Sequence, residues 1–240
     1  MSKVVVITDL RFPEAQEVTS YLTELGYDVR PVPQDVCLWD EAALSAFAEP
    51  FKEDLVGVIH PAPPKIMGGI EEVTEEQWDQ AASEGAVAAM IVTKVFCNIM
   101  RDHRAGSMIY LNSIHSEKPV GKGFLFSLNC GAVQMLSKEV CQDYGVFDVN
   151  VFFVQRGIME EEAAEGKSDA SPIYCGVDLR YPNRRWPEKN HLNGLLAFLL
   201  TDAAQPLTGA TLPADGGFTG FYNHRQTVEG REYFVWKSKK

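Results

Sequence analysis

The chain lacks an excess of basic residues. Its 240 residues hold 22 Lys and Arg against 33 Asp and Glu, which gives a formal net charge of −11 at pH 7. Binding to nucleic-acid phosphates depends on clustered Lys and Arg, so this balance argues against a nucleic-acid partner. Hydrophobic residues make up 45% of the chain, which is typical of a globular protein with a full core.

Metal-ligand patterns and long apolar runs are also missing. The five cysteines form no CxxC pair and the five histidines show no metal-ligand spacing, so we expect neither a disulfide framework nor a metal site. No stretch reaches the roughly 18 uninterrupted apolar residues of a membrane span. The apolar run at residues 4–7 is too short for a signal peptide. We therefore expect a cytoplasmic protein that does not bind membranes.

Apolar runs and amphipathic stretches alternate along the chain. The pattern predicts strands at residues 4–7, 27–32, 55–59, 108–112, 149–154 and 210–214, and helices at 14–25, 40–51, 74–103, 127–144 and 192–200. Thr74 and Gln77 form a capping box at the start of the longest helix. This alternation predicts an α/β fold, a doubly wound parallel sheet with helices on both faces. No repeat or linker divides the chain, so residues 1–240 are expected to form a single Rossmann-like domain.

Two segments stand outside this alternation. Residues 157–190 are polar and rich in Gly, Pro and Arg, which favours a loop or lid over a site. Residues 218–240 carry six aromatic side chains, so this C-terminal extension is expected to pack against its own domain or a neighbouring subunit.

Several residues in this pattern resemble the short-chain dehydrogenase/reductase family. Trp78 opens a long helix, Ser113 closes the next strand, and Phe126 follows 13 residues later. The chain then reads Thr208-Gly209 and Asp215-Gly216-Gly217 near its end. The resemblance covers residues 3–221 and implies a Rossmann-like fold of that family's type. It also implies a place for a dinucleotide cofactor and for a catalytic Ser, Tyr and Lys.

The dinucleotide turn of the family is altered here. The three glycines that let the backbone approach a pyrophosphate correspond to Asp9, Pro13 and Ala15. Proline has no N–H to offer a phosphate, and the carboxylates of Asp9 and Glu14 would repel one by roughly 1–4 kcal/mol each at about 4 Å. We therefore expect a closed site, with the first helix capped by its own carboxylates and Arg11 compensating only in part.

The two neighbouring cofactor segments are altered too. Too few residues follow the second strand for a full parallel crossover, so one helix or strand near residues 33–39 is expected to be deleted, and with it the adenosine end of the pocket. Arg30 is the one candidate there for a phosphate contact. The family's Asn-Asn-Ala-Gly segment corresponds to His60-Pro61-Ala62-Pro63, in which His60 is expected to be structural.

Ser113 is the only retained catalytic position. The family's tyrosine corresponds to Phe126, its lysine to Cys130, and its helix asparagine to Gly85. Phenylalanine has no proton to transfer and cysteine carries no cation. Ser113 on its own is expected to make a strand-end hydrogen bond. We therefore expect no catalytic, cofactor-binding or metal residue in this chain.

These losses predict a pseudoenzyme, a non-catalytic subunit of a heteromeric short-chain alcohol dehydrogenase complex. The expected partner is an active NAD-dependent paralogue that binds the NAD, in a hetero-oligomer expected to be a tetramer. A CoA ester is a candidate substrate of such a complex.

Two alternatives stay open. One is a cofactor-independent enzyme of altered chemistry on the same fold, similar to the halohydrin dehalogenases, in which Ser113 and His115 are conceivable as a pair. The other is a small-molecule-binding regulatory protein that uses the pocket beneath residues 157–190. There, Arg180, Arg184 and Arg185 are candidates for contact with an anionic ligand.

Overall fold

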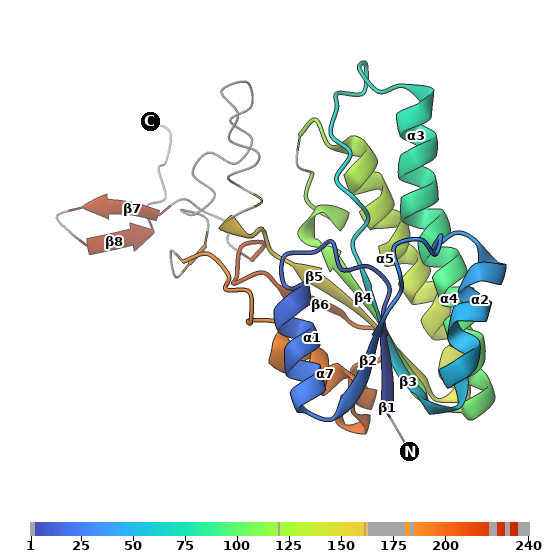
Figure 1. The fold of residues 1–240 in the computed structure, drawn as a ribbon. Helices are drawn as coiled ribbons and strands as arrows, with labels where there is room; N and C mark the ends of the chain where they lie inside the picture. Colours follow the sequence, from blue (N-terminus) through green and yellow to red (C-terminus); the bar gives the residue numbers. More distant parts are fainter. Residues whose placement is uncertain are drawn as a thin grey trace.

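Six parallel strands form the centre of the structure (Figure 1). The computed structural model describes residues 3–119, 121–160, 162, 181–182, 185–220, 225–228 and 231–234. The strands are β1 (Lys3–Ile7), β2 (Tyr27–Pro31), β3 (Leu55–Pro61), β4 (Gly106–Ser113), β5 (Val149–Arg156) and β6 (Thr211–Ala214). Their order is β2-β1-β3-β4-β5-β6, and neighbouring strands pair in parallel. The predicted fold class is confirmed.

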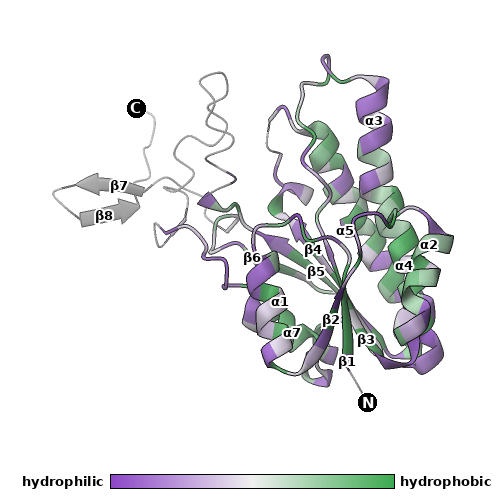
Figure 2. Cartoon of the chain, viewed as in Figure 1, coloured by the Kyte–Doolittle hydropathy of each residue, from purple (hydrophilic) through white to green (hydrophobic). Residues whose placement is uncertain are grey.

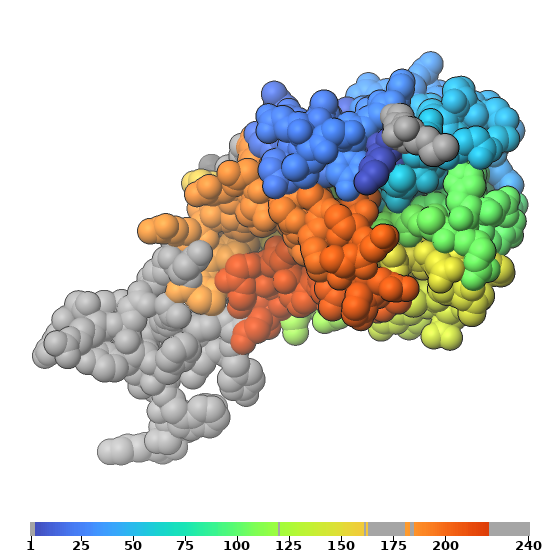
Figure 3. Space-filling model, turned by 90° about the horizontal axis from the view of Figure 1, so that it is seen from below, coloured from blue at the N-terminus to red at the C-terminus, as the bar shows by residue number. Residues whose placement is uncertain are grey.

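Helices cover both faces of this sheet. One face carries α1 (Ala15–Glu24) and α7 (Asn193–Leu199), which lie in contact when the molecule is seen from below (Figure 3). The other face carries α2 (Glu41–Ala48), α4 (Ala88–His103) and α5 (Phe124–Tyr144), and α3 (Glu75–Ala82) extends α4 beyond the sheet. Short helical turns are η1 (Glu49–Asp54), η2 (Ser83–Val87), η3 (Ile114–Ser116), η4 (Gly145–Phe147) and η6 (Asp202–Leu207).

The sheet is apolar on both faces, as its continuous apolar runs predict. Val4 and Val6 of β1 pack in the cluster with α2, α4 and α5, whereas Val5 and Ile7 pack in the cluster with α1 and α7. All four side chains are almost fully buried. Alternate residues of a strand point to opposite faces, so such a strand needs helices on both sides. The hydropathy colouring shows the contrast with the more hydrophilic α3 (Figure 2).

The connection after β2 is short, as predicted. Residues 32–40 form turns and contain neither a helix nor a strand. Asp40 then caps α2 by accepting hydrogen bonds from the N–H groups of Ala42 (2.9 Å) and Ala43 (3.1 Å). The sheet consequently ends at β2.

The long helix predicted for residues 74–103 is present but contains a π turn. Its capping box is formed as predicted, with Gln77 N–H donating to Thr74 Oγ1 and Thr74 N–H donating to Gln77 Oε1. The π turn η2 contains Gly85, where a Cβ would collide with Asn129 of α5. Asn129 Oδ1 accepts the N–H of Ala86 at 2.9 Å. Glycine is therefore required there because α5 reaches into the turn.

This same helix is long and apolar enough by composition to cross a membrane. Half of its most apolar window is buried inside the protein, which is the behaviour of a core helix.

The two segments outside the alternation are described only in part. Most of residues 157–190 lie outside the described residues, but Tyr181 is buried and its hydroxyl accepts the N–H of Ile158 and donates to the carbonyl of Ile158. Phe218 packs on the Tyr181 ring, with ring centroids 5.4 Å apart. Beyond it, β7 (Arg225–Val228) and β8 (Arg231–Phe234) pair antiparallel. The contacts of the other aromatic side chains of the extension lie outside the described residues.

Candidate functional site

A cavity of about 470 Å³ opens at the carboxyl ends of the parallel strands. In open parallel sheets this edge is where ligands bind. Its lining comes from the turn after β1, the turn after β3, and the ends of β4, α5 and β5. The lining residues are Asp9, Arg11, Phe12, Pro13, Pro61, Ala62, Pro63, Pro64, Lys65, Leu111, Phe126, Arg156 and Glu162.

A second hollow of about 460 Å³ lies between the turn after β1 and the connection after β2. It is lined by residues 8–11, residues 32–39 and Glu84. A hollow is therefore present on this side of the turn, although the connection after β2 is short. The short connection folds back into turns whose side chains, Trp39 among them, still enclose a space.

The turn after β1 lies between the two hollows and closes on itself. Asp9 accepts hydrogen bonds from the backbone N–H of Arg11 (2.8 Å) and from its guanidinium Nε (2.8 Å). The same guanidinium lies 3.4 Å from Glu84 in the π turn η2. Asp9 and Arg11 line both hollows.

The predicted capping of α1 by Asp9 and Glu14 is wrong. Asp9 binds Arg11, and Glu14 stands at the N-cap of α1 without a side-chain capping bond. The Glu14 side chain instead turns inward and is fully buried. There, Glu14 Oε1 lies 3.6 Å from Nη1 of the Arg156 guanidinium and forms an ion pair with it.

This turn offers a pyrophosphate fewer backbone donors than a glycine-rich turn would. A pyrophosphate needs free backbone N–H groups, yet the N–H of Arg11 is already donated to Asp9 and Pro13 has none. A dinucleotide that spanned both hollows would also have to pass the Asp9 carboxylate, which repels phosphate.

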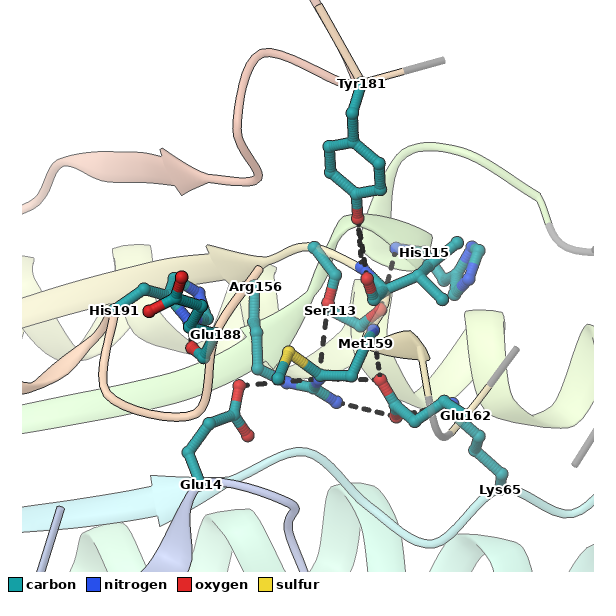
Figure 4. Close-up of polar contacts among 12 residues, drawn as sticks. Glu14, Lys65, Ser113, His115, Arg156, Met159, Glu162, Tyr181, Glu188 and His191 are labelled. Atoms are coloured by element: carbon teal, nitrogen blue, oxygen red, sulfur yellow. Dashed lines mark hydrogen bonds and ion pairs between the residues drawn. The ribbon is translucent and has the colours of Figure 1, made fainter. Parts of the chain in front are cut away.

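A buried chain of charges lies under the first cavity (Figure 4). Arg156, at the end of β5, stands between Glu14 and Glu162 and forms two hydrogen bonds to Glu162, at 2.7 and 2.8 Å. Lys65 Nζ donates to the other side of Glu162 at 2.6 Å. Sequence reasoning missed Arg156 and Glu162. An arginine that ends an otherwise apolar strand was the available signal for the first.

The two carboxylates beside Arg156 have opposite pKa shifts. Burial raises the pKa of Glu14, and the charge of Arg156 offsets this only in part. Burial also acts to raise the pKa of Glu162, but the hydrogen bonds and charge of Arg156, together with Lys65, outweigh it and hold that pKa well below its usual range. Among the described residues, neither Glu14 oxygen has a hydrogen-bond partner.

The residues at the family's catalytic positions do not share one site. The buried ring of Phe126 lines the first cavity, with Lys65 Nζ 5.9 Å from its centroid. Cys130 is buried, and this burial raises the pKa of its thiol to about 12. Ser113 lies outside the cavity lining, and its Oγ accepts the backbone N–H of His115 at 3.2 Å.

His115 does not face Ser113 as an acid–base partner. Its Nδ1 is 2.7 Å from the carbonyl of Lys118, and its ring packs on Phe126 with centroids 5.9 Å apart. Burial lowers its pKa. The structure therefore brings His115 and Phe126 together, and leaves Ser113 as the cap of η3.

The other described residues that the sequence singled out line neither hollow. His60 is buried, its Nδ1 is 2.7 Å from Thr8 Oγ1, and burial lowers its pKa to about 4. Arg30 pairs with Asp28 at 2.7 Å and lines neither hollow. Arg185 is exposed, and Arg180 and Arg184 lie outside the described residues. In the part of the chain that the structure describes, no cluster of His, Cys, Asp or Glu is arranged to hold a metal.

Comparison with known proteins gives relatives over most of the chain. A family model described as enoyl-(acyl carrier protein) reductase matches residues 3–219. The 5-keto-D-gluconate 5-reductase of Escherichia coli is 22% identical over 218 residues, which cover 89% of this chain and 84% of that protein. The 2,5-dichloro-2,5-cyclohexadiene-1,4-diol dehydrogenase LinX of Sphingobium indicum is 26% identical over 232 residues, or 90% and 86% of the two chains.

Solved structures share the fold at lower identity. A gluconate 5-dehydrogenase of Burkholderia cenocepacia, in complex with NADP and tartrate, superposes with a TM-score of 0.81 at 18% identity. The superposition covers 92% of this chain and 96% of that one.

Proposed function

Because the chain belongs to the short-chain dehydrogenase/reductase family, and its site differs from that family's chemistry, we propose that it is a non-catalytic subunit of a heteromeric dehydrogenase. The observation that carries the proposal is the buried ring of Phe126 in the cavity wall, where the family has its catalytic tyrosine. A phenyl ring cannot transfer a proton. The buried, uncharged Cys130 stands where the family has its lysine.

In this proposal the chain binds no dinucleotide, and NAD is bound by an active paralogue. The closed Asp9–Arg11 turn and Pro13 support this part, because the Arg11 N–H is occupied and Pro13 has no N–H to offer a pyrophosphate. The named relatives are reductases and dehydrogenases, so the proposal separates this chain from them by these residues alone.

An apolar face on α4 and α5 supports an assembly. Val87 at the end of η2, Met90 on α4, and Leu128 and Met135 on α5 are large apolar side chains, 39–57% exposed. Exposed apolar patches of this kind mark interaction surfaces. We propose that this face binds the active paralogue in a hetero-oligomer, expected to be a tetramer.

The proposal extends to the substrate of the complex. In its kept fold and lost residues the chain resembles the non-catalytic subunit of the heteromeric 2-[hydroxy(phenyl)methyl]succinyl-CoA dehydrogenase of anaerobic toluene degradation. A CoA-ester substrate follows from that resemblance. If the segment of residues 157–190 shapes the partner's site, replacing Arg184 and Arg185 by Ala changes the Michaelis constant of the assembled enzyme.

Co-expression with an active paralogue from the same organism tests the assembly. We expect a stable complex by size-exclusion chromatography with light scattering, lost in Met90→Arg and Leu128→Arg. Leu207→Arg is the matched control, because Leu207 is also an exposed leucine (38%) but lies in η6. Alcohol oxidation by the purified chain alone, or an unchanged complex in both interface variants, contradicts the proposal.

A further inference from the structure

The first cavity is walled mostly by apolar side chains. Its apolar lining consists of Phe12, Pro13, the turn of residues 61–64, Leu111 and Phe126. Its volume of about 470 Å³ lies within the range of roughly 300–1,000 Å³ that is typical of small-molecule sites. Such sites combine apolar walls with a few polar groups that fix the ligand's orientation.

The two carboxylates that line this cavity are already occupied. Glu162 Oε1 accepts from Lys65 Nζ and Arg156 Nη2, and Oε2 accepts from Arg156 Nη1 and the N–H of Met159. These four bonds fill the acceptor capacity of a carboxylate. Asp9 is similarly occupied by the backbone and guanidinium of Arg11.

Donor capacity, by contrast, is left over at Lys65. An ammonium group has three N–H donors, and Glu162 is the one hydrogen-bond acceptor of Lys65 Nζ among the described residues. This ammonium also lies 5.9 Å from the centroid of the Phe126 ring. The other two lining cations already face two carboxylates each, Arg11 with Asp9 and Glu84, and Arg156 with Glu14 and Glu162.

From this balance of donors and acceptors we propose that the cavity binds a small monocarboxylic acid with an apolar or aromatic body. The carboxylate accepts hydrogen bonds from Lys65 Nζ, and the body packs against Phe126 and Phe12. A neutral or cationic ligand of the same shape binds less well, because the cavity offers no free acceptor among its described side chains. The cavity is lined by residues of this chain, so its ligand binding can be tested without a partner subunit.

Titration of the purified chain with matched probes tests the ligand class. The probes are benzoate and cyclohexanecarboxylate, with benzyl alcohol and benzylammonium as the neutral and cationic counterparts of benzoate. Calorimetry and protein NMR shifts are expected to show saturable binding of both carboxylates, at least about 10-fold tighter than either counterpart. No saturable binding of either acid up to about 10 mM, or equal binding of all probes, overturns the proposal.

Variants then locate the site. Lys65→Met is expected to weaken benzoate binding about 10-fold or more, and Lys65→Arg to retain it. Lys122→Met is the matched control, because Lys122 also pairs with a glutamate, Glu72, but lies outside the cavity. Thermal unfolding checks that each variant is folded. If Lys65→Met fails to fold, Ala62→Phe fills the cavity from its wall without touching the charges, and unchanged binding in that variant contradicts the site.

Discussion

In both β1 and β5, the side chains buried along the strand differ in kind from those buried at or after its carboxyl end. Along their lengths they bury apolar side chains on both faces, such as Val4 and Phe153 on one face and Val5 and Phe152 on the other. At their ends they bury charges, Arg156 on β5 and Glu14 just after β1. Apolar burial stabilises the fold directly, whereas a buried charge is tolerated only when its partners offset the loss of hydration. Apolar packing along the strands therefore stabilises the fold, and charged side chains occupy the carboxyl edge of the sheet.

A second contrast lies within the edge itself. Glu14 and Glu162 flank the same guanidinium, yet one pKa is raised and the other lowered. Glu162 accepts several hydrogen bonds, whereas Glu14 has a single ion pair at 3.6 Å. Hydrogen bonds to the charged form, rather than burial alone, decide the direction of each shift.

The largest expected effect comes from removing the cation that both carboxylates share. Arg156→Met leaves Glu14 and Glu162 buried without it and is expected to lower the free energy of unfolding by about 3–5 kcal/mol. Urea denaturation measures this. Arg30→Met is the control, because it removes an equally short ion pair with Asp28 from an exposed position; its midpoint is expected to stay unchanged. Equal losses of unfolding free energy in the two variants would contradict the claim that the buried ion pairs at the edge matter more than an exposed one.

A steric test asks how far α5 sets the shape of the edge. Gly85→Ala places a Cβ against Asn129 Oδ1 and is expected to destabilise the protein by about 1–3 kcal/mol. Asn129→Ala removes the collision as well as the bond to Ala86 N–H. The double variant is therefore expected to be more stable than the sum of the two single losses, as a double-mutant cycle would show. Simple additivity would contradict the interlock.

The pH dependence of stability separates the two carboxylates. The raised pKa of Glu14 contributes stability below about pH 4.5, and this is lost as the pH rises through the native pKa. Glu14→Gln is therefore expected to gain stability relative to the unmodified chain as the pH rises, on the order of 1 kcal/mol.

Glu162→Gln is expected to show the opposite trend. The lowered pKa of Glu162 contributes stability above about pH 4.5 that is lost as the pH falls. Urea midpoints from about pH 2 to 8 measure both variants, because the Glu162 contribution changes below pH 4.5. Parallel curves for the two would show that the carboxylates are equivalent.

The smallest expected effect is on activity. Restoring the catalytic pair with Phe126→Tyr and Cys130→Lys is expected to give no alcohol oxidation with NAD, because the Arg11 N–H stays bonded to Asp9 and is not offered to a pyrophosphate. A spectrophotometric NADH assay checks this. Turnover by this double variant would mean that the turn accepts the cofactor.

Local patterns predicted the framework well. The apolar runs at residues 4–7 and 55–59 and the capping box at Thr74 each depend on neighbours in sequence, and each is present. The short connection at residues 33–39 followed from a chain-length argument, which is also local.

The arrangement at the edge was not predictable in the same way. Glu14 lies far from Arg156 and Glu162 in the sequence, and only the finished sheet places it beside them. The position of Glu14 at the start of α1 predicts a helix cap. The buried guanidinium that draws it inward is 142 residues away along the chain.

Calorimetric titration of the purified chain with NADH and NADPH tests the central claim most directly. With the Asp9–Arg11 turn closed, we expect no saturable binding of either dinucleotide up to about 1 mM. Binding with a micromolar dissociation constant would show that the turn opens for a pyrophosphate, and it would contradict the account of this chain as a subunit without its own cofactor.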